Sequence, residues 1–198
     1  MSFKRNVAGA AAVAIAMIAG QASAGIIMDF QDLEAYGGGF TEVGYSYIAG
    51  DFEVWHDVNE PFGFRSPHVD NGSFYQGSTG LFNDTVGGIT VLDRLDGAPF
   101  DMESIDLAGL FVGGGDTTVL FTGYLNGGGT VQTSFTTSNG GYGFETFSFA
   151  GLGFNNLDSL QWSQDYVYHQ FDNIAVVPVP GALALLGLAG LARRRRRA

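Results

Sequence analysis

Thr117–Thr136, with the sequence TTVLFTGYLNGGGTVQTSFT, is the stretch that decides the fold class of this chain. Its first half alternates polar and apolar residues, imperfectly, which is typical of a half-buried strand. Asn126 and the glycines after it supply the positive φ angles that a tight hairpin turn needs. The chain then returns with Val131, Thr133 and Phe135 on one face, so the stretch predicts an antiparallel β-hairpin.

The same pattern recurs through the middle of the chain, where short aromatic and β-branched stretches alternate with Gly, Asn and Asp clusters. Residues 25–177 therefore predict one domain of about 150 residues, an all-β antiparallel β-sandwich. Residues 56–87 lack the pattern and predict an irregular excursion, where we expect ligand contacts. The expected strands are Ile26–Phe30, Gly44–Ile48, Phe52–His56, Gly88–Leu92, Glu103–Phe111, Thr117–Leu125, Gly129–Thr136, Phe144–Ala150, Leu157–Gln164 and Phe171–Val177.

The N-terminus has the three parts of a secretory signal peptide. Lys4-Arg5 is a short basic region, Val7–Gly20 is an apolar run without charge, and Ala22 and Ala24 make a small-residue cleavage site. The apolar run is too short to span a bilayer, which takes roughly 20 residues. A buried or anchoring helix is the alternative. We expect residues 1–24 to be a signal helix. It would direct the chain to the Sec machinery for export, and signal peptidase would then remove it.

The C-terminus combines a proline motif, an apolar run and a basic block. The motif ends whatever precedes it, because proline lacks an amide donor and restricts its neighbour. The apolar run Ala182–Ala192, with the uncharged residues before it, predicts a short transmembrane helix. By the positive-inside rule the basic block stays cytoplasmic and stops transfer. The motif is Pro178, Val179, Pro180 and Gly181, and the block is Arg193, Arg194, Arg195, Arg196 and Arg197.

These three parts, in this order at the end of the chain, resemble the PEP-CTERM sorting tail of Gram-negative bacteria that secrete exopolysaccharide. The resemblance covers residues 178–198 and implies processing by an exosortase, a membrane enzyme of the transpeptidase type. Val179 stands where that tail usually has glutamate. A plain single-span anchor is the alternative. The resemblance implies a protein held in the membrane by its tail, at least transiently, and then placed at the cell surface or in the extracellular matrix.

The two ends hold most of the basic residues, so the domain between them is strongly acidic. Removing residues 1–24 and 178–198 leaves Arg65 and Arg94 against all 20 Asp and Glu, a net charge of −18. Such a surface repels nucleic acid, which we exclude as a partner, and suits an acidic matrix bridged by divalent cations. The chain has no cysteine, which excludes disulfides, thiolate metal sites and a cysteine nucleophile.

The order of strands in the core is similar to that of secreted galactose-binding-like jelly-roll domains. The resemblance rests on Phe100–Leu107, Val119–Tyr124, Phe144–Phe149, Leu157–Trp162 and, most sharply, Phe171-Asp172-Asn173-Ile174. It implies a structural calcium ion that joins the first strand to the last, with Asp172 and either Asp32 or Glu34 as ligands. Alternatively, Asp172 caps a turn or orients a loop amide while the other two are solvated. The resemblance implies no catalytic activity.

The sequence contains no catalytic motif. It has no Gly-x-Ser-x-Gly elbow, and among 20 acidic residues a pair suited to glycoside hydrolysis arises by chance. The histidines lack metal-ligand spacing, so no zinc site is predicted. Tyr166 and Tyr168 share one face and are candidates for stacking on a sugar ring, with rim packing as the alternative. Trp55 and Tyr75 are further aromatic candidates, whereas Trp162 is expected in the core.

The leading interpretation is a non-catalytic structural or adhesive protein of the cell envelope or exopolysaccharide matrix. The alternative is an extracellular carbohydrate-binding module, and a secreted glycan-active enzyme comes third. Calcium is the one cofactor expected. Beside the export and sorting enzymes, the expected partners are extracellular polysaccharide and, through the tail, the membrane.

Overall fold

The computed structural model describes residues 25–56, 61–165 and 168–179. Almost all regular structure in these residues is β-strand, and the strands are separated by turns rich in glycine. The elements are β1 (Ile26–Met28), the 3-10 helix η1 (Gln31–Leu33), β2 (Phe40–Gly44), β3 (Ser46–Ala49), β4 (Phe52–His56), β5 (Phe64–Pro67), β6 (Phe82–Asn83), β7 (Ile89–Arg94), β8 (Phe100–Gly109), β9 (Thr118–Leu125), β10 (Thr130–Thr136), β11 (Glu145–Ser148), β12 (Leu157–Ser163) and β13 (His169–Pro178).

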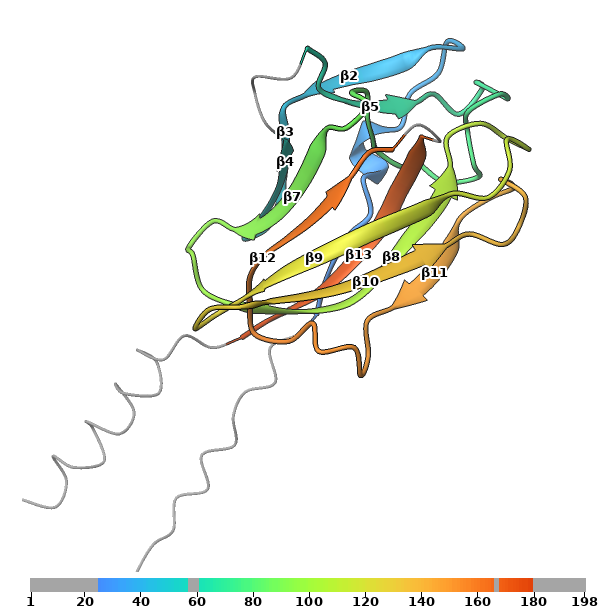
Figure 1. The fold of residues 1–198 in the computed structure, drawn as a ribbon. Helices are drawn as coiled ribbons and strands as arrows, with labels where there is room; N and C mark the ends of the chain where they lie inside the picture. The colour runs from blue at the N-terminus through green and yellow to red at the C-terminus, as the bar shows by residue number, and fades with distance from the viewer. Residues whose placement is uncertain (1–24, 57–60, 166–167, 180–198) are drawn as a thin grey trace, which may run out of the picture.

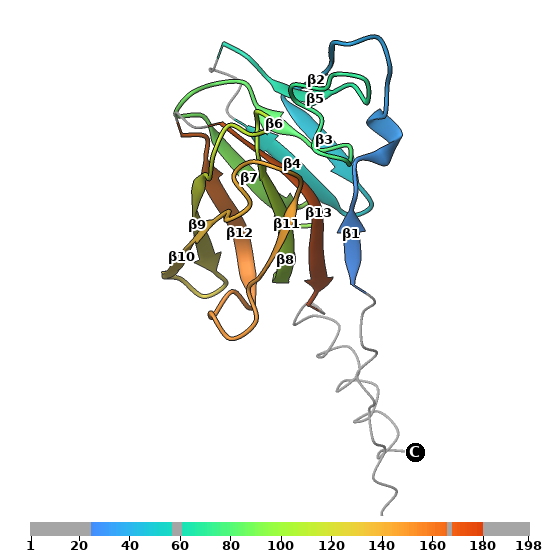
Figure 2. The same cartoon turned by 90° about the vertical axis from the view of Figure 1, so that its right-hand side faces the viewer.

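Paired strands run antiparallel throughout the described residues, which confirms the predicted all-β antiparallel class. Ten strands are connected as one sheet, but β12 and β8 share only the pair Leu157–Phe100, so this sheet folds into two layers. One layer contains β1, β13, β8 and β11, and the other contains β3, β4, β7, β12, β9 and β10. In Figure 1 β9 crosses in front of β13 and β8, and in Figure 2 β9, β10 and β12 lie to the left of β13 and β1. The domain is therefore a β-sandwich.

The core between the layers is built largely from aromatic rings that meet edge to face. The ring centroids of Phe52 on β4 and Phe100 on β8 are 5.3 Å apart, and those of Trp162 on β12 and Phe171 on β13 are 5.1 Å apart. Both pairs join the two layers, and all four side chains are buried. The core position of Trp162 confirms the prediction made from the alternation of its strand. Edge-to-face pairs add about 0.5 to 1.5 kcal/mol each beyond their buried area.

A second sheet, of β2, β5 and β6, lies across one end of the sandwich (Figure 1). Phe64 of β5 packs with its ring 6.0 Å from that of Phe171, and an isolated bridge joins Leu81 to Phe171. Gly80 permits this approach, because a Cβ there would lie 3.0 Å from the carbonyl oxygen of Phe171. The interpretation of residues 56–87 as irregular is wrong at β5 and β6. These strands have four and two residues, too few to show an alternating pattern.

Most other strands lie close to their predicted bounds, and Phe52–His56 agrees at both ends. The predicted strand Gly44–Ile48 is confirmed for Ser46–Ile48 and wrong at its start, because two strands meet there. Gly44 ends β2 with φ of 92°, a backbone angle that few side chains tolerate, and β3 begins at Ser46. The first strand stops at Met28, two residues before the left-handed Phe30.

β1 pairs with β13, so the two ends of the described domain lie together at the end opposite the small sheet (Figure 2). β13 runs to Pro178, and the amide of Val179 donates to the carbonyl oxygen of Pro99 at 3.0 Å. The predicted signal helix and cleavage site, Pro180, Gly181, the tail helix and the arginine block lie outside the described residues. No helix in the described part of the chain is long and apolar enough to cross a membrane.

Candidate functional site

An open cavity of about 580 Å³ lies between the small sheet and the loops at that end of the sandwich. Its volume falls in the range of roughly 300 to 1,000 Å³ that small-molecule sites occupy. Each strand of the small sheet contributes one side chain, and neighbouring loops close the sides. The lining residues are Phe40 of β2, Arg65 of β5, Phe82 of β6, Phe74 and Asp84 beside these strands, Leu110, Phe111 and Gly114 after β8, and Tyr168 just before β13.

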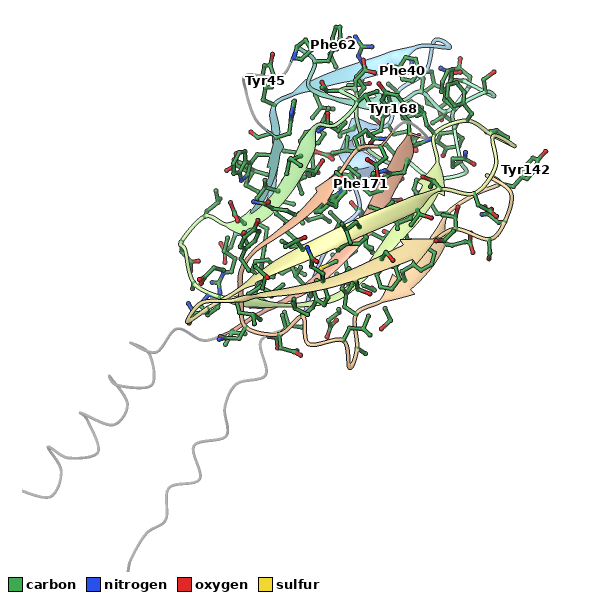
Figure 3. All side chains as sticks on the ribbon, in the orientation of Figure 1. Phe40, Tyr45, Phe62, Tyr142, Tyr168 and Phe171 are labelled. Carbon is green, nitrogen blue, oxygen red and sulfur yellow. The ribbon has the colours of Figure 1, made fainter. Side chains whose placement is uncertain are left out.

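Aromatic rings form most of the pocket wall. The ring of Phe40 meets Phe74 at 4.9 Å and Phe82 at 5.6 Å, both edge to face. Phe111 packs against Phe74 at 5.0 Å, and Tyr168 lies 6.5 Å from Phe82. Figure 3 shows Phe40 and Tyr168 near each other below β2. Because half of the Phe111 side chain is exposed, the wall presents aromatic surface to a molecule that enters the cavity.

Arg65 and Asp84 place one pair of opposite charges in this wall. Nη1 of Arg65 donates to Oδ2 of Asp84 at 2.6 Å, and Nη2 donates to Oε1 of Glu42 at 2.7 Å. Burial raises the pKa of the Asp84 carboxyl, and the Arg65 guanidinium opposes that shift. The hydrogen bond to Glu42 raises the pKa of Arg65. The cavity therefore offers a carboxyl acceptor and a guanidinium donor side by side.

Two buried glutamines hold the loops that carry the pocket wall. Nε2 of Gln170 donates to the carbonyl oxygens of Phe74 at 2.6 Å and Leu110 at 3.1 Å. Nε2 of Gln76 donates to the carbonyl oxygen of Gly109 at 2.7 Å. Breaking such buried bonds strands a polar group away from water and costs about 1 to 3 kcal/mol. The wall is therefore fixed before anything binds.

Glycines bring the loop after β8 close to this wall. The amide of Val112 donates to the carbonyl oxygen of Ser73 at 3.0 Å, which ties this loop to the one that carries Phe74. A Cβ on Gly114 would lie 2.9 Å from the Cβ of Phe111. Any side chain at Gly114 would therefore displace the exposed ring from the wall.

Of the predicted sugar-stacking residues, the structure places Tyr168 in the pocket and Trp55 elsewhere. Tyr168 lines the pocket, where burial and the nearby Asp84 raise the pKa of its hydroxyl. Tyr166 lies outside the described residues. Trp55 lies elsewhere, half-buried on the outer side of β4, where its Nε1 donates to Oδ2 of Asp93 at 2.8 Å.

The predicted calcium ligand Asp172 is buried and already hydrogen-bonded. Its Oδ2 accepts from the hydroxyl of Ser78 at 2.6 Å, and its Oδ1 accepts from the amide of Asn173 at 2.7 Å. Burial is the main cause that raises the pKa of Asp172 to about 6, with smaller contributions from Asp106 and Asp29. These contacts match the alternative in which Asp172 orders a loop.

The other two predicted ligands have separate partners. Oδ1 of Asp32 accepts from the hydroxyl of Tyr47 at 2.7 Å, and Oε1 of Glu34 accepts from the hydroxyl of Tyr36 at 3.1 Å. Within the described ranges, no three His, Asp or Glu side chains gather as a group that could hold a metal ion. The structure does not bring the three predicted ligands together, and the calcium site stays a prediction.

Sequence reasoning locates the pocket only in part. Residues 56–87, predicted to carry ligand contacts, supply Arg65, Phe74, Phe82 and Asp84. Phe40 and Phe111 are missed, because an isolated phenylalanine gives no alternating signal. Each stands beside a run of glycines, Gly37–Gly39 and Gly113–Gly115, and that pairing is the signal that could have found them.

Comparison with known proteins gives little beyond this geometry. No protein-family model matches the sequence, and no curated protein matches it. Among solved structures, a family 29 carbohydrate-binding module from Piromyces equi aligns with 13% sequence identity over 72% of this chain and 91% of that module, with a TM-score of 0.38. A likeness of that size bears on neither ligand nor activity.

Proposed function

We propose that this chain is an exported, non-catalytic carbohydrate-binding protein that holds a sugar in the aromatic pocket. The observation that carries the proposal is a cavity of about 580 Å³ whose wall combines aromatic rings with one arginine–aspartate pair. This is the combination that small-molecule sites use, with apolar surface for affinity and a few placed polar groups for orientation.

A pyranose ring complements this wall because it has two kinds of surface. Its C–H faces are apolar and pack on aromatic rings such as those of Phe111 and Tyr168. Its ring edge carries hydroxyls, which both donate and accept hydrogen bonds. Asp84 would accept from one hydroxyl while Arg65 donates to its neighbour, and bonds to charged groups are the stronger kind.

The polar groups of the pocket favour binding over catalysis. Glycoside hydrolysis takes two carboxyl groups that flank the scissile bond. The described lining has one, Asp84, which is paired with Arg65. A purely structural or adhesive role, the leading interpretation of the sequence, leaves the open aromatic cavity without a use.

Several parts of the proposal rest on the sequence. They are export by the signal peptide, sorting by the PEP-CTERM-like tail, placement at the cell surface or in a polysaccharide matrix, jelly-roll connectivity of the sandwich, and the structural calcium ion. A carbohydrate-binding domain held at the surface by its tail would attach the cell to extracellular polysaccharide.

The experiment is calorimetric titration of the full-length chain with neutral mono- and disaccharides, repeated for Phe111→Ala. Half-exposed Phe111 can be removed with little loss of stability, so the variant tests the wall and not the fold. Loss of an aromatic stacking partner is expected to weaken binding by about tenfold, since aromatic residues dominate binding free energy.

Tyr142→Ala is the matched control. Tyr142 is also exposed, projects from a neighbouring loop (Figure 3) and does not line the pocket. Affinity unchanged in Tyr142→Ala and reduced in Phe111→Ala supports the proposal. Equal affinity in the two variants, or no binding of any saccharide by the wild-type chain, would overturn it.

A further inference from the structure

A second surface with chemistry of its own lies on the outer side of β9, β10 and β12. Side chains alternate between the two faces of a strand, and the outward positions here are identified by their exposure. They are the even-numbered residues from Thr118 to Tyr124 and from Thr130 to Thr136, and the odd-numbered residues from Ser159 to Ser163. We name this surface the uncharged face. In Figure 1 it belongs to the layer in which β9 and β10 lie in front of β8 and β13.

The uncharged face differs from the rest of the domain in charge. Residues 25–177 contain 20 acidic residues and two arginines, yet the outward positions named above are all Thr, Ser, Gln, Leu or Tyr. The one acidic residue on these three strands is the exposed Asp158, which lies at the irregular start of β12 and accepts from Nδ2 of Asn126 at 2.7 Å. Solvated surfaces normally carry Asp, Glu, Lys and Arg. An acidic protein that merely keeps a sheet face in water would place some of its carboxylates there. The face is therefore suited to contact something neutral and polar.

Side chains on the face already bond to one another. Thr118 and Thr136 share a hydrogen bond of 2.7 Å between their hydroxyls. Nε2 of Gln132 donates to the hydroxyl of Thr122 at 3.0 Å. The hydroxyl of Tyr124 donates to Oε1 of Gln161 at 3.1 Å. Each bond crosses from one strand to another, so the polar groups are held in a regular array.

One row of the register connects this array to the neighbouring strands β7 and β4 of the same layer. Gln132, Thr122 and Gln161 are successive cross-strand partners on β10, β9 and β12. The next partners in the row are Val91 on β7 and Trp55 on β4, whose indole is fixed by its bond to Asp93. The row thus runs from amide and hydroxyl groups, past the buried Val91, to an aromatic ring. Asp93 and Glu53 lie beside that ring, so the uncharged face itself ends at β12.

We propose that the uncharged face is a second binding surface, and that its occupant is an extended, uncharged polysaccharide chain lying across the strands. Neighbouring strands are about 4.8 Å apart, close to the advance of one sugar residue along an extended chain. On β10, β9 and β12 each sugar would meet a fresh hydroxyl or amide group. Tyr124 and Trp55 would supply aromatic surface. The proposal goes beyond the pocket and does not depend on it.

Charge decides which polymer fits. An anionic polysaccharide would meet a domain with net charge −18 and no Lys or Arg on this face, so repulsion would oppose it. Nucleic acid is opposed in the same way. A neutral chain meets no such repulsion. A second copy of this chain could also cover the face, and the experiment below separates that outcome.

The experiment is titration of the full-length chain with cellohexaose, xylohexaose and mannohexaose, with the matching disaccharides, and with hexagalacturonate. A surface that spans several strands gains contacts with each sugar. We therefore expect a neutral hexasaccharide to bind at least about tenfold more tightly than its disaccharide, and hexagalacturonate to bind weakest.

Two variants test the surface itself. Thr122→Arg places a bulky cation at the centre of the face, and Tyr124→Ala removes an aromatic ring with less risk to folding. Both are expected to weaken hexasaccharide binding by about tenfold or more and to leave disaccharide binding in the pocket unchanged. Leu95→Arg, at an exposed turn, is the charge-matched control. Phe111→Ala should weaken disaccharide binding in the pocket and leave hexasaccharide binding to the face unchanged, since it alters only the pocket.

The results separate this proposal from the pocket. Hexasaccharide binding that is lost in Thr122→Arg but kept in Leu95→Arg and Phe111→Ala supports it. Binding that all variants retain, or that no neutral hexasaccharide shows, would overturn it. A wild-type dimer, seen by sedimentation and dissociated by Thr122→Arg without change in saccharide binding, would overturn it in favour of a second copy.

Discussion

The pocket and the uncharged face are two ways of building a binding surface on one sandwich. The pocket takes its side chains from the small sheet and several loops, and buried glutamines fix those loops. The uncharged face takes its side chains from alternate positions on three neighbouring strands, and exposed bonds join them. The difference shows that the depth of the pocket comes from loops held by buried groups, whereas the breadth of the uncharged face comes from the register of neighbouring strands. Damage to a buried support should therefore alter the pocket far more than the face.

The largest effect should come from a residue on which both surfaces depend. Phe171 packs edge to face against Trp162 of β12, in the other layer, and against Phe64 of the small sheet. Phe171→Ala should lower the free energy of unfolding by about 3 to 5 kcal/mol, because it removes a fully buried ring and leaves a cavity. Urea unfolding followed by circular dichroism and tryptophan fluorescence measures this change.

The same experiment tests whether the two regions form one cooperative unit. Coincident transitions for both signals are expected, since Phe171 joins them. Leu152→Ala, at a half-exposed position, is the control and should change the free energy of unfolding by less than about 1 kcal/mol. Two separate transitions would show that the small sheet unfolds independently and would break the link between pocket and sandwich.

The second prediction compares the loss of a glutamine that supports the pocket with the loss of one on the uncharged face. Gln170→Leu leaves the carbonyl oxygens of Phe74 and Leu110 buried without their donor, so stability should fall by about 1 to 3 kcal/mol. Affinity for a monosaccharide should also fall, because both wall loops lose their support. Gln161→Leu, on the uncharged face, removes one exposed acceptor and should leave stability and monosaccharide affinity nearly unchanged. Similar effects from the two variants would contradict the contrast between buried and exposed support.

How much of each region the sequence predicts follows from the same contrast. The strands of the uncharged face are predicted close to their true bounds, because alternation over seven or eight residues is a strong signal. The burial of Trp162 follows from that alternation as well. Alternation alone does not indicate that these outward positions lack charge while the rest of the domain is acidic.

The pocket is predicted poorly for a physical reason. Phe40, Arg65 and Phe82 lie on strands so short that their pairing, and not their sequence, decides the structure. Phe111 and Tyr168 belong to loops that Gln170 ties together through its bond to the carbonyl oxygen of Leu110, which lies 60 residues away in the chain. Tyr168 is found from the sequence because it shares a face with Tyr166, two residues earlier, as a candidate for stacking on a sugar. The cluster that it joins depends on tertiary contacts.

The third effect depends on pH and concerns the buried carboxyl of Asp172 on β13. Burial raises the pKa of Asp172 to about 6, above its ordinary value near 3.8. Between these values the unfolded chain is ionised while the folded chain keeps its proton, so the folded state loses stability as pH rises. Asp172→Asn cannot ionise. Relative to wild type it should gain about 1 to 2 kcal/mol between about pH 4 and pH 7, measured by urea unfolding at each pH.

Calcium sharpens this test. Calcium binds the ionised carboxylate, so an ion at Asp172 would stabilise the wild-type chain at neutral pH and leave Asp172→Asn unaffected. Thermal unfolding at about pH 7, with and without millimolar calcium, compares the two chains. A calcium-dependent rise in Tm that the variant lacks would support the predicted site. An equal Tm with and without calcium in the wild-type chain would leave Ser78 and Asn173 as the only established partners of this carboxyl.

The smallest effect should come from the uncharged face itself. Thr118 and Thr136 bond across β9 and β10 in full contact with water, so the coupling between them should be only about 0.2 to 0.5 kcal/mol. A double-mutant cycle with Thr118→Val and Thr136→Val measures that coupling in urea unfolding. Valine keeps the β-branched shape, so each change removes the hydroxyl and little else. A coupling above about 1 kcal/mol would mean that the hydroxyl array supports the fold as Gln170 does, and the uncharged composition would then have a structural explanation. A small coupling leaves the absence of charge unexplained by stability, which is what a surface kept for a neutral polysaccharide predicts.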